Sequence, residues 1–367
     1  MKDYFDISIN TLIIGGGPSG ATLARKLAKS SIDTILIEKN FSFDKPCGGG
    51  IKSIVFSEFD IPKELEIKQI TKFNLITKKE AVSVNLVKTP ISIVLRKEFD
   101  HELRNLAQKD GAKLLEGKYI NSKFYDDCII SEIKTTESKV IFIKSKYLVA
   151  ADGVNSTVRK KILNTQTSSL LTNYSLIENQ DIDYCDFYFG KDFAPNEYAW
   201  IFPHGDKLSI GSILKSDKLK KVFEEFKNID FKGSKVKGYF IPSWNNEKIF
   251  YRNRTFFVGD CAGQVLPFTY EGIYFAMKSA HILADAIIEN NPDLYEKKRN
   301  EIYLKKFRFF KIMQKIFLYN DFFANFMIKI FKNNRLQGRC LNYWEGSLKP
   351  ISIYKIPQKI LKYLFKK

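Results

Sequence analysis

Histidine and cysteine are scarce in this chain of 367 residues. It has three His and five Cys, and the cysteines stand apart at positions 47, 128, 185, 261 and 340. No C-x-x-C pair and no cluster of His and Cys occurs, so the sequence indicates neither a structural metal site nor a disulfide framework. We expect reduced thiols and no bound metal, as in a cytoplasmic protein.

Long uninterrupted apolar runs are also missing. Between Lys311 and Lys332, apolar side chains recur every three or four positions, which predicts a helix with a wide apolar stripe. Lys315, Asp321 and Lys329 interrupt this stripe, so it is too polar for a membrane span. The first ten residues carry acidic side chains where a secretory signal has its apolar core. We therefore expect a cytoplasmic protein that is neither exported nor membrane-spanning.

Acidic residues are outnumbered by basic ones. The chain has 59 Lys and Arg against 41 Asp and Glu, a net charge of +18, and residues 296–367 alone hold eighteen basic and four acidic residues. This asymmetry favours an anionic membrane surface as a partner, with the protein peripheral on the inner face of the cell membrane. A solvated lysine-rich tail is the other interpretation. Nucleic acid is not expected, because the basic region shows apolar stripes rather than a mixed basic and polar face.

The last segment, residues 351–367, mixes lysines with apolar side chains. Such a basic amphipathic segment can lie in a bilayer interface. It can equally form a helix that packs on the body of the protein with its lysines outward. The sequence leaves both readings open, and it leaves the oligomeric state unknown.

A glycine-rich turn joins two apolar runs in residues 10–39. Gly15, Gly17 and Gly20 have G-x-G-x-x-G spacing, after a predicted strand at Thr11–Ile14 and at the start of a predicted helix at Pro18–Ser30. In this context the glycines allow a tight turn, approach of the backbone to a pyrophosphate and close packing of helix on strand. The free N–H groups at the helix start, near Ser19, face the phosphates. The stretch predicts a Rossmann-type dinucleotide site.

Two acidic residues at strand ends extend this site. Glu38 closes the second apolar run, where a ribose hydroxyl needs an acceptor. Asp260 follows the buried strand predicted at residues 255–258, just before a helix predicted at residues 271–289. An acceptor there can bind a sugar-alcohol chain, and the helix N-terminus, at Gly272 and Ile273, can hold negative charge on a ring oxygen. FAD uses both features and NAD needs neither, so the dinucleotide is identified as FAD.

The patterning predicts an α/β fold with an interrupted domain. Residues 1–70, 91–162 and 250–290 are expected to form the FAD-binding domain. Residues 71–90, a predicted hairpin, and 163–249, a series of separated strands, are expected to form a mostly antiparallel β domain for the substrate. Residues 291–367 are expected to form a basic helical C-terminal region. The glycine-rich stretch from Phe41 to Ser53 is expected to be an irregular loop, followed by a helix beginning near Ile51.

Three further residues are candidates for the cofactor site. Asp152 lies in Ala151-Asp152-Gly153, directly after a predicted strand, and we expect it to contact FAD as Asp260 does. Arg96, at the start of a predicted helix, is a cation for the pyrophosphate. Ile120, in one of the short strands that follow, is assigned to the cofactor site as well.

These motifs, in this order and spacing, resemble the FAD-dependent oxidoreductases of the para-hydroxybenzoate hydroxylase fold. Two further motifs narrow the resemblance to the geranylgeranyl reductase family. Residues 46–50, PCGGG, resemble its P-C-G-G motif, and residues 195–203, PNEYAWIFP, match its P-x-x-Y-x-W-x-F-P motif at every defined position. The resemblance covers roughly residues 7–290.

The resemblance implies a reaction and its site. A reduced flavin delivers hydride from N5 to an isoprenoid C=C bond of a lipid, a quinone tail or a prenyl diphosphate, after reduction by NAD(P)H or a small electron carrier. Cys47, Gly48 and Gly50 are implied to lie beside the flavin, with Cys47 as the candidate catalytic residue. Because alternate residues of a strand share a face, Tyr198, Trp200 and Phe202 can form an aromatic wall for the substrate.

Some alternatives stay open. An aromatic hydroxylase of the same fold and a membrane-docked electron-transfer flavoprotein share the FAD motifs. Tyr270 stands where the family usually has glycine in its T-G-E-G-I-like run, so the loop near the flavin is expected to differ in shape. The chain length, headgroup and number of bonds reduced do not follow from the sequence.

Overall fold

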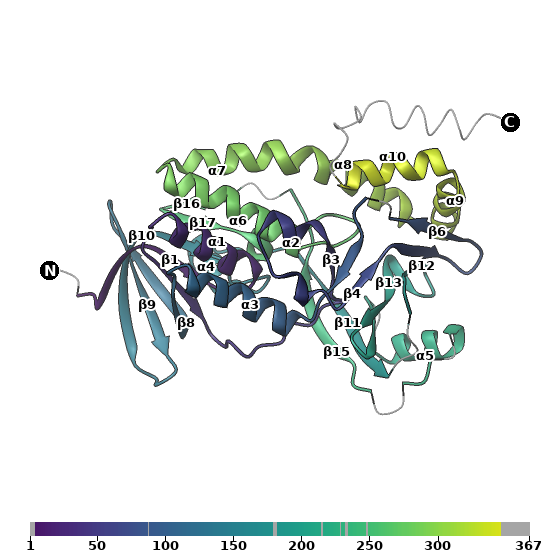
Figure 1. Ribbon diagram of the computed structural model, residues 1–367, viewed down its shortest axis with the longest axis horizontal. Coiled ribbons are helices and arrows are strands. Elements are labelled where there is room, and N and C mark those ends of the chain that lie inside the picture. The colour runs from purple at the N-terminus through teal and green to yellow at the C-terminus, as the bar shows by residue number, and fades with distance from the viewer. Residues whose placement is uncertain are drawn as a thin grey trace.

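The computed structural model describes residues 4–86, 88–178, 182–213, 216–227, 229–231, 234–246 and 249–345. Two seven-stranded sheets lie along the long axis of the molecule, and the C-terminal helices run along one side of both (Figure 1). A third, three-stranded sheet is formed by β3 (Gly50–Lys52), β4 (Lys68–Ile70) and β7 (Ile91–Ile93), in the order β3-β7-β4.

The first sheet has a parallel core. Its order is β1-β2-β8-β9-β10-β17-β16, and β1 also pairs with β10. Its strands are β1 (Ile7–Ile14), β2 (Thr34–Glu38), β8 (Lys113–Phe124), β9 (Ile129–Thr135), β10 (Val140–Ala150), β16 (Tyr251–Arg252) and β17 (Thr255–Phe257). Ile13 of the central strand pairs with Leu36 on one side and Val149 on the other, in parallel. All three are fully buried, which explains why these strands read as continuous apolar runs.

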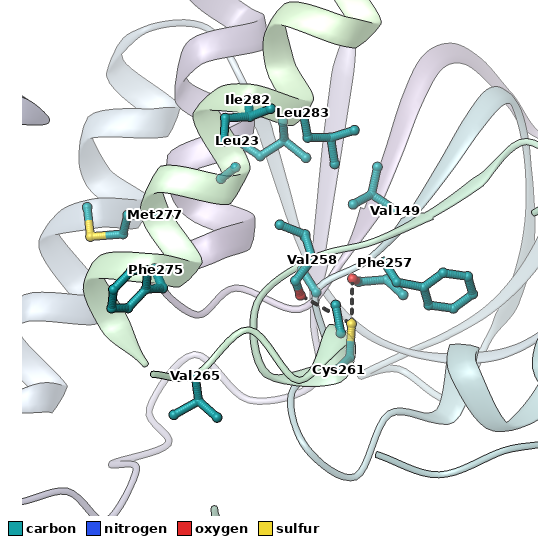
Figure 2. Close-up of a cluster of buried hydrophobic side chains, with 14 of the residues drawn as sticks. Leu23, Val149, Phe257, Val258, Cys261, Val265, Phe275, Met277, Ile282 and Leu283 are labelled. Carbon is teal, nitrogen blue, oxygen red and sulfur yellow. Dashed lines mark hydrogen bonds between the residues drawn. The ribbon is translucent and has the colours of Figure 1, made fainter. Parts of the chain in front are cut away.

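Three helices pack over this core: α1 (Pro18–Lys29), α3 (Arg96–Lys109) and α6 (Ile273–Ile288), with α1 contacting the other two. Figure 2 shows Leu23 of α1 and Leu283 of α6 gathered over the strands that carry Val149 and Phe257. Shorter elements complete this part: α2 (Ile54–Glu58), η1 (Lys63–Leu65), α4 (Thr157–Leu163) and η2 (Gly259–Ala262). The thiol of Cys261 donates to the carbonyls of Ala150 and Val258, at 2.9 and 3.2 Å, so it serves the packing (Figure 2).

The second sheet is almost entirely antiparallel, in the order β15-β11-β14-β13-β12-β5-β6. Its strands are β5 (Lys72–Ile76), β6 (Ala81–Asn85), β11 (Ser169–Glu178), β12 (Cys185–Gly190), β13 (Ala194–His204), β14 (Lys207–Ser212) and β15 (Lys237–Pro242). The predicted hairpin, now β5 and β6, joins it through a parallel pairing of β5 with β12. The helix α5 (Ser216–Lys227) and the strand β15 were not predicted; α5 is amphipathic and as long as α1, so its pattern could have indicated it.

One expectation near the glycine-rich loop is wrong. Residues 50–52 were expected to be irregular or to begin a helix, but they form β3, which pairs with β7 from Gly50 opposite Ile93 to Lys52 opposite Ile91. The helix begins only at Ile54. The hydrogen bonds of β3 come from a strand about forty residues further along the chain, so local composition does not reveal it.

The C-terminal region is helical through Glu345, as expected. Its elements are α7 (Pro292–Arg299), η3 (Asn300–Leu304), α8 (Lys305–Phe317), α9 (Asp321–Phe331) and α10 (Asn334–Glu345). The α7 helix contacts α6 beside the first sheet, and α9 contacts β6 and β12 of the second. Within the described part of the chain, no helix combines the length and apolar character of a membrane span. The amphipathic segment at 351–367 lies outside the described residues.

The apolar stripe at 311–332 is divided between two helices. Asn320 has an extended backbone, with φ −165° and ψ 175°, and its side chain accepts a hydrogen bond from the Phe323 N–H at 3.0 Å. It therefore ends the path of α8 and caps α9. The 3.6-residue periodicity continues across the break, which is why the sequence predicts one stripe.

Replacing Asn320 by Ala removes this cap. We expect the free energy of unfolding to fall by about 1 kcal/mol, because one N–H at the start of α9 loses its acceptor. Urea titration followed by circular dichroism measures the change. Asn121→Ala, at an exposed position of β8, is the control and should change stability by less than the cap variant does. Equal effects of the two substitutions would contradict the capping role.

Candidate active site

A cavity of about 650 Å³ lies between the first and second sheets. Its lining includes most of the residues singled out from the sequence: Gly15, Gly17, Ser19, Glu38, Cys47, Gly48, Gly50, Arg96, Asp152, Tyr198, Trp200, Phe202, Asp260, Gly272 and Ile273. These residues come from eight separate stretches of the chain. The fold thus brings the dinucleotide motif and the aromatic strand to the walls of one cavity.

Two of the expected residues do not line the cavity. Gly20 lies behind the wall, where α1 packs on the turn after β1. Ile120 lies where the register of β8 against β9 shifts, between Tyr119 and Asn121. This irregularity turns Ile120 out of the lining, and Lys118 and Tyr119 line the cavity instead.

The turn after β1 forms one wall. Gly15 has φ +110°, and a Cβ there would lie 2.2 Å from the Ala151 carbonyl oxygen; a Cβ on Gly20 would lie 1.9 Å from the Gly15 carbonyl oxygen. A Cβ on Gly17, by contrast, would meet no atom within 4 Å. Gly17 precedes α1, and no side chain caps that helix. The free N–H groups of its first turn are therefore available to an anion in the cavity.

Glu38 stands beside this turn at the end of β2. Its carboxylate accepts hydrogen bonds from the N–H groups of Gly16, at 2.7 Å, and Asn40, at 3.1 Å. Arg104 of α3 donates to the Gly16 carbonyl at 3.1 Å and to the Phe41 carbonyl at 2.8 Å. Glu38 and Arg104 therefore stabilise the turn by hydrogen bonds, although neither belongs to the glycine motif.

Arg96 is buried and paired. Its guanidinium donates to both carboxylate oxygens of Asp100, at 3.1 and 2.8 Å, and the two residues are 5% and 6% exposed. Burial alone would lower the pKa of Arg96, but Asp100 and the neighbouring sulfur of Cys47 raise it. Asp100 neutralises much of its charge, so Arg96 is better placed to position Cys47 than to neutralise a pyrophosphate alone. The Cys47 sulfur also accepts from the Gly49 N–H at 3.4 Å.

Asp260 and Asp152 have different polar partners. Asp260 forms an ion pair of 2.6 Å with Lys45, from the loop that carries Cys47. Asp152 instead accepts from the Ser156 hydroxyl at 2.5 Å and from the N–H groups of Thr157 and Val158 at 2.7 and 3.1 Å, so it caps α4. Burial raises the pKa of Asp152, and these hydrogen bonds oppose the shift. Its main visible role is to hold the chain after β10.

The aromatic wall stands opposite. Tyr198, Trp200 and Phe202 project from the same side of β13 into the cavity. A Cβ on Gly48 would lie 2.9 Å from the Phe202 ring and 3.4 Å from the Trp200 indole nitrogen, so the PCGGG loop packs directly on the wall. Trp200 pairs across the sheet with Gly211, whose missing side chain makes room for the indole.

Tyr270 occupies a backbone conformation that favours glycine, with φ 54°. Its hydroxyl donates to Glu197 at 2.6 Å and accepts from Gln314 of α8 at 2.9 Å. Its ring lies 6.0 Å from that of Tyr198, whose hydroxyl donates to the Thr269 carbonyl at 2.9 Å. The loop therefore keeps the backbone conformation that glycine would adopt, and these hydrogen bonds stabilise it with a larger residue in place.

A polar cluster stands at the edge of the cavity, and two of its members, Lys52 and Glu271, belong to the cavity lining. Lys52, 3% exposed, donates to the Trp344 carbonyl at 2.9 Å and lies 3.4 Å from Glu271. Lys306 of α8 donates to the same carbonyl at 2.6 Å, and the Trp344 indole donates to Glu271. Burial lowers the pKa of Lys306 to about 7, with the charge of Lys52 acting in the same direction and Glu271 opposing it. The cluster ties the end of α10 to the cavity wall.

Known proteins resemble this chain over most of its length. A model described as an FAD binding domain matches residues 8–176, and one described as a geranylgeranyl reductase catalytic domain matches residues 164–237. The chain is 31% identical over 319 residues to the digeranylgeranylglycerophospholipid reductase of Methanocaldococcus jannaschii, covering 76% of this chain and 75% of that protein. The chain belongs to the geranylgeranyl reductase family. It is thus an FAD-dependent oxidoreductase of that type.

Two further comparisons agree with this family. The chloroplastic geranylgeranyl diphosphate reductase of Nicotiana tabacum is 29% identical over 350 residues, covering 84% of this chain and 75% of that protein. Among solved structures, a geranylgeranyl bacteriochlorophyll reductase-like protein of Thermoplasma acidophilum has a TM-score of 0.80 at 22% identity, covering 89% of this chain and 92% of that one. At that identity, the structural likeness shows the fold alone.

The cavity fits FAD. The uncapped start of α1 at Gly17 offers N–H groups to a pyrophosphate, and Glu38 and Asp260 offer acceptors to hydroxyl groups. The buried hydroxyl of Thr269, on the cavity wall, has no hydrogen-bond partner among the described residues. A polar ligand in the cavity would satisfy it.

Several site residues were missed from the sequence of this reductase. Lys45 precedes the PCGGG motif, and nothing in the sequence pairs it with Asp260 far along the chain. Gly211 could have been found, because an antiparallel pairing of the strands around residues 204–206 sets it opposite Trp200. The contacts of Trp344 with Glu271 and two lysines carry no sequence signal, since three distant segments meet there.

Gly211→Ala tests whether the space above Gly211 holds the Trp200 indole in position. A Cβ at Gly211 would lie 2.0 Å from the indole, so we expect the ring to be displaced while FAD remains bound through the other wall. Near-ultraviolet circular dichroism and the ratio of flavin to protein absorbance report the two properties. Gly338→Ala, where a Cβ meets no atom within 4 Å, is the control. An unchanged tryptophan spectrum in Gly211→Ala would show that the indole is not held there.

The pH dependence of stability in Lys306→Met tests the polar cluster around Trp344. Burial lowers the pKa of Lys306 in the folded state, so keeping this lysine charged there destabilises the fold. The destabilisation is greatest below the folded-state pKa. It disappears as pH rises toward the pKa of lysine in the unfolded chain, about 10.4. We therefore expect Lys306→Met to stabilise the protein more at about pH 6 than at about pH 9, measured by urea unfolding. The exposed neighbour Lys305→Met should show no such trend. A stability gain independent of pH would contradict the lowered pKa.

Proposed function

We propose that this protein reduces C=C bonds of an isoprenoid chain, with FAD held by the first sheet and the substrate by the second. One observation supports this most: an aromatic wall of three residues faces the dinucleotide turn across a single cavity and packs on the loop of Cys47. A wall of apolar rings suits a hydrocarbon chain and excludes water from the reacting bond. The match to a geranylgeranyl reductase catalytic domain over residues 164–237 supports the same reaction.

The proposed roles follow the walls. For FAD we propose Gly15, Gly17, Ser19, Gly20, Glu38, Cys47, Gly48, Gly50, Arg96, Asp152, Asp260, Gly272 and Ile273, with Gly20 and Asp152 acting by shaping the site. For the substrate we propose Tyr198, Trp200 and Phe202. When bound, FAD supplies a hydride, from N5 of the reduced ring, to one carbon of the double bond. Reduction by NAD(P)H or a small electron carrier precedes this, since the sequence shows no second dinucleotide motif.

The second carbon of the double bond needs a proton. Cys47 lines the cavity on the loop that touches the aromatic wall, and its sulfur lies beside the guanidinium of Arg96. We propose that Cys47 donates this proton and that Arg96, held by Asp100, positions the thiol. The neighbouring Tyr198 hydroxyl is committed to the Thr269 carbonyl, and burial raises its pKa, which makes it a poorer source.

The substrate class follows the names of the relatives. Two of them are a digeranylgeranylglycerophospholipid reductase and a geranylgeranyl diphosphate reductase. We propose a geranylgeranyl or other polyprenyl chain on a lipid, a quinone or a diphosphate for this protein, and peripheral association with an anionic membrane where such chains reside. The hydroxylase and electron-transfer alternatives share the FAD motifs, but neither accounts for the P-x-x-Y-x-W-x-F-P wall.

The decisive experiment is anaerobic turnover. The purified flavoprotein, reduced with dithionite, is mixed with geranylgeranyl diphosphate or a geranylgeranylated glycerophospholipid, and the product is analysed by mass spectrometry. We expect the mass to rise by dihydrogen for each bond reduced. Trp200→Ala should lower kcat/KM by about tenfold or more, because the chain loses part of its wall.

Cys47→Ala should lower kcat by about a hundredfold with little change in KM, as expected when a proton donor is removed. Cys340→Ala, another partly buried cysteine, is the matched control. Full activity of Cys47→Ala would place the proton source elsewhere, in water. Unchanged isoprenoid mass together with oxygen-dependent hydroxylation of an aromatic acceptor would support the hydroxylase instead.

A further inference from the structure

Two aromatic side chains project into solvent at the turn between α8 and α9. Tyr319 is 70% exposed and Phe322 is 69% exposed, whereas most aromatic residues of the described chain are buried or half-buried. Phe322 stacks on Phe326 at 6.3 Å and meets Phe323 edge-on at 5.6 Å, and Phe323 meets Tyr319 in the same way. These four rings form one continuous surface, which we call the α8–α9 patch.

A hydrogen bond, an ion pair and a ring contact attach the α8–α9 patch to the second sheet. Asn325 of α9 accepts a hydrogen bond from Thr77 of the second sheet at 2.5 Å, and Lys332 pairs with Glu80 at 2.7 Å. On the other side of the turn, the ring of Phe317 lies 4.6 Å from that of Phe189. The exposed rings therefore belong to helices that are packed against the second sheet. The α9 helix lies at one end of the molecule, beside β6 (Figure 1).

Basic side chains are exposed around the patch. Lys315 on α8 and Lys329 on α9 are exposed on either side of it, and neither forms an ion pair within the described part of the chain. Asp321 is the only acidic residue between positions 302 and 344, and it turns inward to accept the Lys191 N–H at 2.9 Å. The surface thus combines exposed rings with exposed lysines, of which Lys329 also interacts electrostatically with Glu80.

We propose that the α8–α9 patch docks the protein on a bilayer that contains anionic lipids. Tyr319 and Phe322 enter the headgroup region, where rings with one wet edge are favourable, and Lys315 and Lys329 contact lipid phosphates. This inference rests on the proposed isoprenoid-lipid substrate, since it accounts for how the protein reaches such a chain.

The position of the patch suits substrate uptake. A second cavity, of about 350 Å³, lies between the patch and the β12–β13 turn, and Tyr319 and Phe322 are part of its lining. Glu197 lines the same cavity and accepts the hydrogen bond from Tyr270, which lines the main one. This pair of side chains links the two linings, so docking at the patch places the bilayer next to the active-site wall.

Charge also argues against two other occupants. Residues 346–367 of the chain carry six lysines and no acidic residue, so they would bring like charge to a basic surface. A second copy of the protein would bring its own basic patch. An anionic bilayer has the complementary sign.

The test is sedimentation of the full-length flavoprotein with lipid vesicles. We expect binding to vesicles of phosphatidylcholine with phosphatidylglycerol, weakening as salt is added, and little binding to phosphatidylcholine alone. Tyr319→Ser with Phe322→Ser should weaken binding about tenfold, and Lys315→Gln with Lys329→Gln about thirtyfold. Equal binding by these variants and the natural protein, or no binding to either vesicle, would overturn the proposal.

Matched control variants lie at the opposite end of the molecule. Tyr4→Ser with Phe124→Ser removes two aromatic residues, 72% and 39% exposed, and Lys134→Gln with Lys139→Gln removes two exposed lysines. Both should bind like the natural protein. A loss equal to that of the patch variants would mean that general charge or hydrophobicity, rather than the patch, drives binding, and would overturn the proposal.

Two further readings separate the possible outcomes. Phe322→Trp should show a blue shift of tryptophan emission when phosphatidylglycerol vesicles are added. If the emission is already blue-shifted without vesicles and does not change when they are added, the chain itself or a second copy covers the patch. That result would contradict the proposal. Reduction of a detergent-dispersed isoprenoid should be unaffected in the patch variants, while reduction of the same substrate in vesicles should fall with binding. Failure of the detergent assay in the natural protein would count against the proposed function, and the binding result would still decide the patch.

Discussion

A backbone contact with no room for a side chain underlies the whole site. The turn after β1, the first turn of α1 and the residue after β10 meet at Gly15, Gly20 and Ala151, where a Cβ on either glycine would overlap a carbonyl oxygen. This contact aims the uncapped start of α1 into the cavity. It also brings the ends of the parallel strands together, so that the residues after β1, β2, β10 and β17 line one cavity.

The opposite wall depends on a second close fit. Trp200 fills the space above Gly211, and Phe202 fills the space above Gly48, so the second sheet and the Cys47 loop pack through aromatic rings on glycines. Such contacts leave little tolerance in volume, since interiors are close-packed. The reacting groups are therefore positioned by small residues as much as by large ones.

The C-terminal helices connect the two halves rather than forming an appendage. The α7 helix packs on α6, α9 packs on the second sheet, and Lys52, Lys306 and Trp344 tie the end of α10 to Glu271 at the cavity. Basic residues of this region thus have two uses. Lys306 is drawn inward, where burial lowers its pKa, and Lys315 and Lys329 stay in water. Net charge alone does not distinguish them.

Local sequence determined the parts of this reductase that depend on neighbours in the chain. The apolar run of β1, the glycine spacing, the α1 helix and the hairpin of β5 and β6 were predictable, because each pattern reflects its own backbone. The family motifs likewise indicated FAD and an aromatic strand. Two other features, the cap at Asn320 that breaks the apolar stripe and the cap that Asp152 provides, are made by residues within six positions of each other, but the periodicity of apolar residues does not reveal them. Tertiary structure alone decided that Gly50–Lys52 is a strand, that Lys45 pairs with Asp260 and that the shifted pairing of β8 with β9 leaves Ile120 outside the cavity lining. These outcomes depend on contacts between separate segments of the chain, and periodicity and composition carry no information about such contacts.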